Sequence, residues 1–155
     1  MRTHWIAAVC VVMLTVATGT AAGAGDSIYG TVTAVRRADL VVFDYGSGSY
    51  LVHVVGIDLP RDREAAAYAR TFVAGIVLHR HVRIRIEGRR DGILDARILT
   101  ADSVVGFNHD VGLELVRNGF ARRMHNFDYS YGELSGAERE ARLAGRGVWA
   151  AERNR

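Results

Sequence analysis

The fold is decided by the stretch Ile28–Val55, which reads IYGTVTAVRRADLVVFDYGSGSYLVHVV. Ile28–Val35 is rich in β-forming residues, and a short polar turn leads from it into a second such run, Leu40–Asp44. A loop of glycine and serine at residues 46–49 leads into a third run, Tyr50–Val55. Three strands joined by turns this short predict an antiparallel meander.

After the meander, the spacing of apolar residues changes from that of strands to that of a helix and back again. Asp62 stands where an N-cap is expected, just before a run with helical spacing. Strict alternation in His81–Ile86 predicts that Val82, Ile84 and Ile86 face the core. The elements expected in this half are a helix at Glu64–Leu78, strands at His81–Ile86 and Ile93–Thr100 separated by a turn at residues 88–91, and helices at Asp110–Asn118 and Leu134–Ala144.

The order of these elements, β-β-β-α-β-β-α-α, predicts an α+β fold that is mainly β. Five short strands interrupted by a helix after the third are typical of a small Greek-key barrel of the OB type, here with three helices. A general α+β sandwich is the alternative. No linker, repeat or low-complexity tract divides residues 25–155, so we expect a single domain there.

Residues 1–24 have the features of an export signal. Arg2 and His4 precede an apolar run, Trp5–Val16, and small residues follow it as far as Ala24. The apolar run has 12 residues, whereas a helix that spans a bilayer needs roughly 20. We therefore expect a cleaved signal peptide and a secreted or periplasmic mature protein without stable membrane insertion. An uncleaved anchor is the alternative if the helix continues through the small residues.

The composition excludes several classes of protein. The chain has 155 residues, 49% of them hydrophobic, and a formal net charge of +3, which is not the composition of a disordered or collagen-like chain. A single Cys excludes a disulfide scaffold and a multi-cysteine zinc site. All 20 basic residues are Arg, which we attribute to codon usage rather than to phosphate recognition.

Four stretches, in order and at suitable spacing, resemble the staphylococcal nuclease (thermonuclease) family across most of the mature chain. The first stretch, Gly30–Val41, resembles the family's first hairpin around D-G-D-T-V, and the second, Val52–Pro60, resembles V-R-L-x-G-I-D-x-P-E. The third, Leu113–Ala121, resembles L-x-L-V-x-x-G-x-A, and the fourth, Ala141–Trp149, resembles A-R-x-x-x-x-G-x-W.

This resemblance implies a calcium-dependent phosphodiesterase that acts on DNA or RNA. Such chemistry uses an oxygen-rich cage for the cation and a carboxylate that positions the attacking water. It also uses two arginines that clamp the phosphate and stabilise the developing charge. Asp39 and Asp58 match two metal ligands of the active relatives. The resemblance therefore implies at most weak binding of calcium or another divalent metal.

The other functional positions depart from the family's pattern. Arg37 stands at the first Asp of D-G-D-T, and His53 stands at the clamping arginine of V-R-L. Arg61 stands at the carboxylate that positions water, and the simplest alignment puts Asp95 at the second arginine. At Arg61 and Asp95 the charge is reversed. The resemblance thus implies a catalytic apparatus that is substantially degraded.

Some alternatives remain open at this stage. A shifted alignment keeps part of the set, with Arg97 as the second arginine and Glu64 as the carboxylate. His53 is expected to face the barrel and to be satisfied by a hydrogen bond from a neighbour. A sharper hypothesis is that Asp39, His53 and Asp58 meet and hold Zn or Mn.

The densest basic stretch of the chain is a candidate surface for nucleic acid. Its alternative is a solvated strand face that blocks edge pairing, and an aromatic loop residue packs at least as often as it stacks on a base. The candidate nucleic-acid-binding residues are Arg83, Arg85, Arg89, Arg90 and Phe127.

We therefore expect an exported, monomeric, thermonuclease-like domain that binds single-stranded nucleic acid, a nucleotide or another anionic ligand with little or no hydrolysis. One alternative is an active metal-dependent endonuclease that uses Asp39 and Asp58. Another is a structural or protein-binding domain of the cell envelope.

Overall fold

The computed structural model describes residues 25–102, 106–129 and 132–150. The strands are β1 (Ser27–Arg37), β2 (Leu40–Tyr45), β3 (Gly48–Val54), β4 (Ile57–Asp58), β5 (His81–Arg90), β6 (Ile93–Asp102), β7 (Gly106–Asp110) and β8 (Arg122–Arg123). The helices are α1 (Arg63–Val77), α2 (Val111–Arg117), α3 (Glu133–Ala144) and the short 3₁₀ helix η2 (Gly147–Trp149). The expected signal peptide lies outside the described residues.

Five strands close into a mixed barrel in the order β3-β2-β1-β5-β6. The meander β1-β2-β3 and the pairs β1–β5 and β5–β6 are antiparallel, and a parallel pairing of β3 with β6 closes the ring. The predicted OB-type barrel with three helices is confirmed, and the sandwich alternative is wrong.

The barrel interior is built from residues that alternate along each strand. Val82, Ile84 and Ile86 are at most 1% exposed, so the predicted inward face of β5 is confirmed. Burying each such side chain contributes about 1.5–3 kcal/mol relative to leaving it in water. The residues that join them in the interior are Val32, Val41, Phe43, Val52, Val54, Leu94, Ala96 and Ile98.

Several element boundaries differ from the predictions. The turn expected at residues 88–91 is shorter, because β5 continues to Arg90 and the chain reverses at Asp91 and Gly92, both with positive φ. Gly48 and Ser49, expected in a loop, begin β3. The prediction also lacks β4, β7 and β8. Strands β4 and β8 have two residues each, which is too short to show an alternation of apolar and polar residues.

The three predicted helices are confirmed, and two are capped by aspartates. The carboxylate of Asp62 accepts a hydrogen bond of 2.8 Å from the Ala65 amide at the start of α1. Asp110 plays the same role for α2, accepting 2.9 Å from Leu113. Trp149, which ends the last of the four resembling stretches, is 2% exposed.

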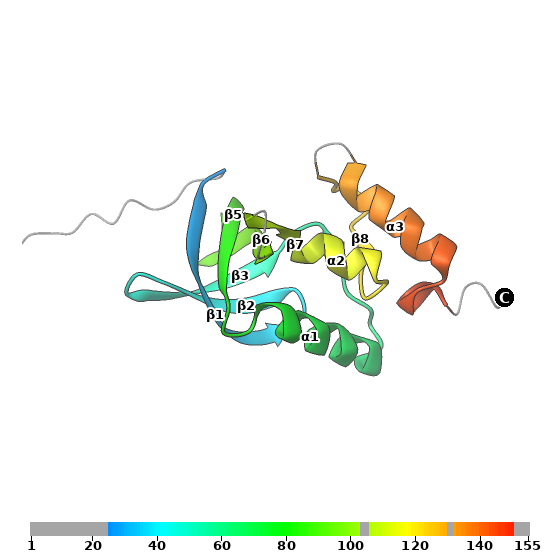
Figure 1. The fold of residues 1–155 in the computed structure, drawn as a ribbon, viewed down its shortest axis with the longest axis horizontal. Helices are drawn as coiled ribbons and strands as arrows, with labels where there is room; N and C mark the ends of the chain where they lie inside the picture. The colour runs from blue at the N-terminus through cyan, green and yellow to red at the C-terminus, as the bar shows by residue number, and fades with distance from the viewer. Residues whose placement is uncertain (1–24, 103–105, 130–131, 151–155) are drawn as a thin grey trace, which may run out of the picture.

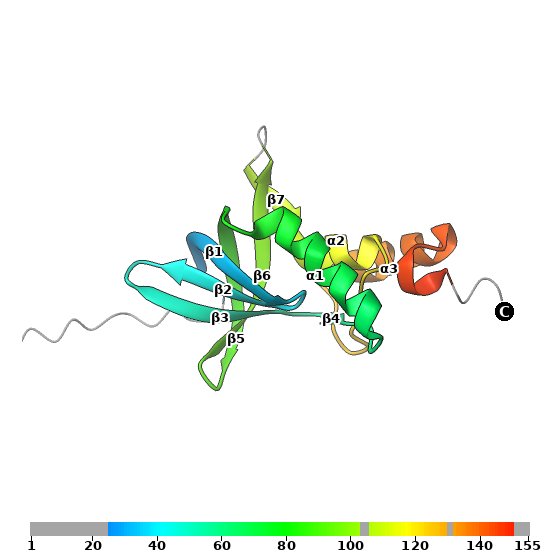
Figure 2. The ribbon, with the colours of Figure 1, turned by 90° about the horizontal axis from the view of Figure 1, so that it is seen from below.

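The views in Figures 1 and 2 place the barrel at one end of the molecule, α3 and η2 at the other and α2 between them, with α1 along the side. The two-stranded sheet of β4 and β8 connects the barrel to the α3 end, because β4 follows β3 and β8 follows α2. No helix in the described part of the chain combines the length and apolar character needed to cross a membrane.

Candidate functional site

Asp58 lies on β4, opposite Arg122 of β8, and three adjoining clefts include it in their walls. They enclose about 410, 400 and 510 Å³. Arg37, Asp39 and His53 line the first, and the second contains Arg61. The third runs along β8 to α3. The fold therefore brings Asp39, His53, Asp58 and Arg61 together around one grooved surface.

Asp39 is held by the arginine two residues before it. Arg37 Nε donates to Asp39 Oδ1 at 2.8 Å, and Arg37 Nη2 donates to Asp39 Oδ2 at 2.9 Å. Such a two-pronged pair is the strongest geometry that an arginine and a carboxylate adopt. Both oxygens of Asp39 therefore already accept a hydrogen bond from a cation.

His53 faces outward from the barrel, so the expectation that it faces inward is wrong. Its neighbours Val52 and Val54 fill the interior, and the alternation of the strand turns His53 to the opposite face. Its Nδ1 lies 2.9 Å from Asp95 Oδ1. Because a carboxylate only accepts, this nitrogen carries the proton and Nε2 faces Asp39 Oδ2 at 3.8 Å. Asp95 also accepts from Arg90 Nη2 at 3.1 Å.

Asp58 and Arg61 differ from these paired groups. Both are exposed, and neither forms a hydrogen bond or ion pair through its side chain within the described residues. Asp62, in the same cleft, is engaged as the N-cap of α1. The second cleft thus offers one uncommitted carboxylate and one uncommitted guanidinium.

The third cleft is rich in arginine. The guanidinium carbons of Arg122 and Arg142 lie 4.4 and 4.1 Å from the ring centroid of Trp149, so a buried aromatic ring positions both cations. Glu138 partly balances the charge, at 3.6 Å from Arg142 and 4.0 Å from Arg123. The third cleft therefore gathers several guanidinium groups beside the buried ring of Trp149 and the carboxylate of Glu138.

The two substitutes that a shifted alignment would supply do not reach the cleft. Arg97 shares the outer face of β6 with Asp95, but its Nε donates to Asp110 Oδ2 at 2.7 Å. Its guanidinium carbon lies 3.8 Å from the centroid of the Tyr129 ring. Glu64 projects from α1 and accepts a hydrogen bond from Tyr68 at 3.4 Å. The shifted alignment therefore gains no support from their positions.

The predicted nucleic-acid-binding arginines lie on β5, and none of them is among the described residues that line the three clefts, although Arg90 shares Asp95 with His53 of the first cleft. Arg85 is 3.4 Å from Glu87, Arg90 pairs with Asp95, and Arg89 is exposed. Phe127 is half-buried against the core, with its ring centroid 6.0 Å from that of Tyr129. Their role toward nucleic acid stays a prediction.

The hypothesis of a Zn or Mn site is wrong for this structure. Among the described residues, no three His, Cys, Asp or Glu side chains are grouped so that they could hold a metal ion. Asp39, His53 and Asp58 line one cleft, but both oxygens of Asp39 already accept hydrogen bonds from Arg37.

Sequence reasoning missed the arginines of the third cleft. Arg122 and Arg123 were not singled out because they lie in a polar segment that pairs with β4 through only two residues. Arg142 appeared only as part of a closing motif. One sequence signal could have indicated this contact. Arg142 and Trp149 stand on either side of the turn that ends α3, so the turn can bring the cation and the aromatic ring together.

Comparison with known proteins agrees with this geometry. Residues 51–151 match the staphylococcal nuclease homologue family, and they include Asp58, Arg61, Asp95 and the whole third cleft. A search of the curated proteins found no match to the chain. Since the family match covers well over half of the chain, this protein belongs to the staphylococcal nuclease homologue family.

Proposed function

We propose that this domain binds single-stranded nucleic acid or a nucleotide in the groove around Asp58, with little or no metal-dependent hydrolysis. The observation that carries the proposal is the pairing of Arg37 with both oxygens of Asp39. Domains of this family bind nucleic acid, which supports the choice of ligand.

The residues present do not fit calcium, on which the family typically depends. Calcium takes six to eight oxygen ligands in proteins. Asp39 would have to exchange two charge-assisted hydrogen bonds from Arg37 for the ion. Asp58 is the other carboxylate of the first cleft. A guanidinium at about 5 Å and an effective dielectric of 20 repels a unit positive charge by about 3 kcal/mol, and Arg61 lies in the adjoining cleft.

The same residues favour an anion. Arg61, Arg122 and Arg142 line the two clefts that continue from Asp58, and the ring of Trp149 holds the latter two in place. Arginine suits phosphate because its planar guanidinium donates through two N–H groups at once. Contacts of this kind supply the affinity for a polyanion without selecting its sequence.

The first experiment tests hydrolysis. The protein is incubated with single-stranded DNA and RNA in calcium or manganese, beside a variant that restores the family's pattern: His53→Arg, Arg61→Glu and Asp95→Arg. We expect little or no cleavage by the natural protein. Robust cleavage by it would overturn the proposal in favour of an active endonuclease.

The second experiment tests binding. Affinity for a fluorescent oligonucleotide is measured across salt concentrations, where release of counterions makes phosphate-driven binding fall steeply as salt rises. Arg61→Ala should weaken binding, whereas Arg139→Ala, an exposed arginine of α3 outside the cleft linings, should not. Absence of binding at low salt would favour a structural or protein-binding domain.

A double variant, Arg85→Ala with Arg89→Ala, separates the groove from the predicted basic strand. If β5 carries the ligand, this variant will weaken binding more than Arg61→Ala does. If the groove carries it, the order will be reversed.

We also propose that the protein is exported, with residues 1–24 removed as a signal peptide. The short apolar run and the small residues after it support this proposal. N-terminal sequencing of protein from the exported fraction should begin near Gly23 or Gly25. An intact Met1 in the membrane pellet would favour the anchor instead.

A further inference from the structure

A fourth hollow, which no functional assignment explains, adjoins the groove. It encloses about 190 Å³ and is lined mainly by apolar atoms. It lies where the start of α1, the turn after α2 and η2 meet. Its walls are formed by Pro60, Ala65, Tyr68, Gly119, Phe120, Gly147 and Val148. We call this hollow the Tyr68 pocket.

The floor of the Tyr68 pocket is fixed by backbone. The Val148 amide donates to the Gly119 carbonyl at 3.0 Å. A Cβ on Gly119 would lie 2.2 Å from the Arg146 carbonyl oxygen, and one on Gly147 would lie 2.2 Å from that of Gly119. Both glycines also have positive φ, which side chains disfavour. A residue with a Cβ at either position would therefore prevent the close approach of these two backbone segments.

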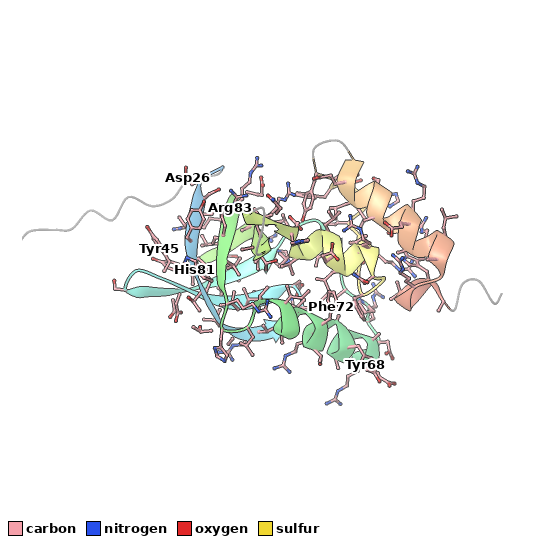
Figure 3. The ribbon with its side chains drawn as sticks, viewed as in Figure 1. Asp26, Tyr45, Tyr68, Phe72, His81 and Arg83 are labelled. Atoms are coloured by element: carbon pink, nitrogen blue, oxygen red, sulfur yellow. The ribbon has the colours of Figure 1, made fainter. Side chains whose placement is uncertain are left out.

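One wall of the pocket is rigid and the other is open. The ring of Phe120 packs on that of Phe72, with centroids 4.7 Å apart. Tyr68 is 61% exposed, and its hydroxyl is tethered to Glu64 on the same helix. Figure 3 labels Tyr68 at the end of α1 that lies away from β5. A flat apolar group that enters the pocket would therefore meet one fixed ring and one accessible ring.

The pocket shares walls with the cationic cleft. Pro60 and Val148 line both, and the cleft on their other side holds Arg61 and Arg122. An apolar hollow joined to a cationic cleft fits a ligand with a flat ring and an anionic group a short distance apart. Small-molecule sites typically combine apolar walls with a few placed polar groups in this way.

We propose that the Tyr68 pocket receives a base of single-stranded nucleic acid whose adjacent phosphate lies on Arg61 and Arg122. This inference rests on the proposed function and adds a base-binding position to it. Aromatic side chains beside a cationic groove are the usual means by which proteins hold single strands without reading their sequence. Arg61, which stands where active relatives carry an acidic group, contributes here a contact to phosphate.

The test compares oligothymidylate with an abasic oligonucleotide of the same length, which keeps the phosphates and lacks the bases. Fluorescence anisotropy is measured for the full-length natural protein, for Tyr68→Ala, and for Tyr45→Ala as a matched control. Tyr45 is also an exposed tyrosine, 47% against 61%, but lies at the end of β2.

We expect Tyr68→Ala to lower the affinity for oligothymidylate about fivefold or more and to leave the abasic affinity unchanged. Tyr45→Ala should change neither affinity. In NMR spectra, the methyl signals of Val148 should shift with oligothymidylate and not with inorganic pyrophosphate, because ring currents of a bound base reach them.

Two results would overturn the inference, and they distinguish a failure of the base position from a failure of the proposed function. If the natural protein binds both oligonucleotides equally and Tyr68→Ala has no effect, phosphate binding stands and the base position does not. The pocket would then suit an apolar segment of a protein instead. If the natural protein binds neither oligonucleotide at low salt, the proposed function itself fails and this inference fails with it.

Discussion

Two arginine–aspartate pairs in this molecule have similar lengths, but their arginines differ in exposure. Arg97 donates to Asp110 at 2.7 Å, and the two side chains are 15% and 3% exposed. Arg37 donates to Asp39 at 2.8 Å, and here the arginine is 62% exposed and the aspartate 11%. The first pair lies within the body of the domain, and the second lines the candidate groove around Asp58. The burial of the arginine, rather than the length of the bond, distinguishes the two pairs.

Arg97 and Asp110 also form contacts with residues outside the pair. Asp110 also accepts hydrogen bonds from the Leu113 amide at 2.9 Å and from the Tyr129 hydroxyl at 3.3 Å. The ring of Tyr129 covers Arg97. Removing Asp110 would leave the largely buried guanidinium of Arg97 with only its longer contact of 3.5 Å to Glu133, and breaking a buried pair in this way is strongly destabilising. In the second pair only the arginine is exposed, so water can replace the guanidinium of Arg37, whereas the carboxylate of Asp39 is itself buried.

The largest expected effect is that of Asp110→Ala. It removes the partner of buried Arg97 and the N-cap of α2 together, so it should lower the free energy of unfolding by about 3–5 kcal/mol. Urea titration measures the loss. The matched control is Asp62→Ala, which removes an exposed N-cap with no buried ion pair and should cost about 1 kcal/mol. Equal losses in the two variants would contradict the distinction drawn here.

Tyr129→Phe should have an intermediate effect. The hydroxyl lies 3.3 Å from both the Val55 carbonyl and Asp110 Oδ1, and it is buried. Its removal should lower the free energy of unfolding by about 1 kcal/mol. Tyr68→Phe removes an exposed hydroxyl and should change stability by less than about 0.5 kcal/mol. A larger loss from Tyr68→Phe would argue against burial as the cause.

The same tyrosine predicts a dependence on pH. Burial, and next the negative charge of Asp110, raise the pKa of Tyr129 above its ordinary value near 10. The folded protein therefore keeps this proton at pH values where the unfolded chain releases it. The contribution of Tyr129 should be complete below about pH 10 and should decline as the pH rises further. Urea titrations between pH 9 and 11 should show the stability gap between the natural protein and Tyr129→Phe narrowing. A constant gap would contradict the assignment.

The difference between the pairs also explains what the sequence could predict. Alternation identifies Val82, Ile84 and Ile86 as interior because the period of a strand is local. The cap at Asp62 depends on a residue three positions away. Both are short-range properties that neighbouring residues determine. The predictions of the barrel core and of the helices succeeded for this reason.

The hydrogen-bond partners of side chains on the barrel surface are often residues far away in the sequence. His53 meets Asp95 only because β3 and β6 pair in parallel, 42 residues apart. Arg97 and Asp95 share one strand face, yet only Arg97 turns toward Asp110. The sequence resemblance drew attention to His53 and Arg61, and both line the groove. The pairings that now bind Asp39 and Asp95 depend on strand register and side-chain packing, which no local pattern reveals.

The smallest expected effect is that of Arg37→Ala, and it tests the comparison most directly. Since Arg37 is 62% exposed, its removal should open the 11% exposed Asp39 carboxylate to water, and we expect the pair to contribute only about 1 kcal/mol to the free energy of unfolding. The change frees both oxygens of Asp39 in the first cleft. Arg36→Ala, which removes a neighbouring exposed arginine, is the control for net charge. Urea titration of both variants should give small and similar losses. A loss from Arg37→Ala approaching that of Asp110→Ala would show that the groove pair also holds the barrel together, and the groove would then not be free to change its chemistry independently of the fold.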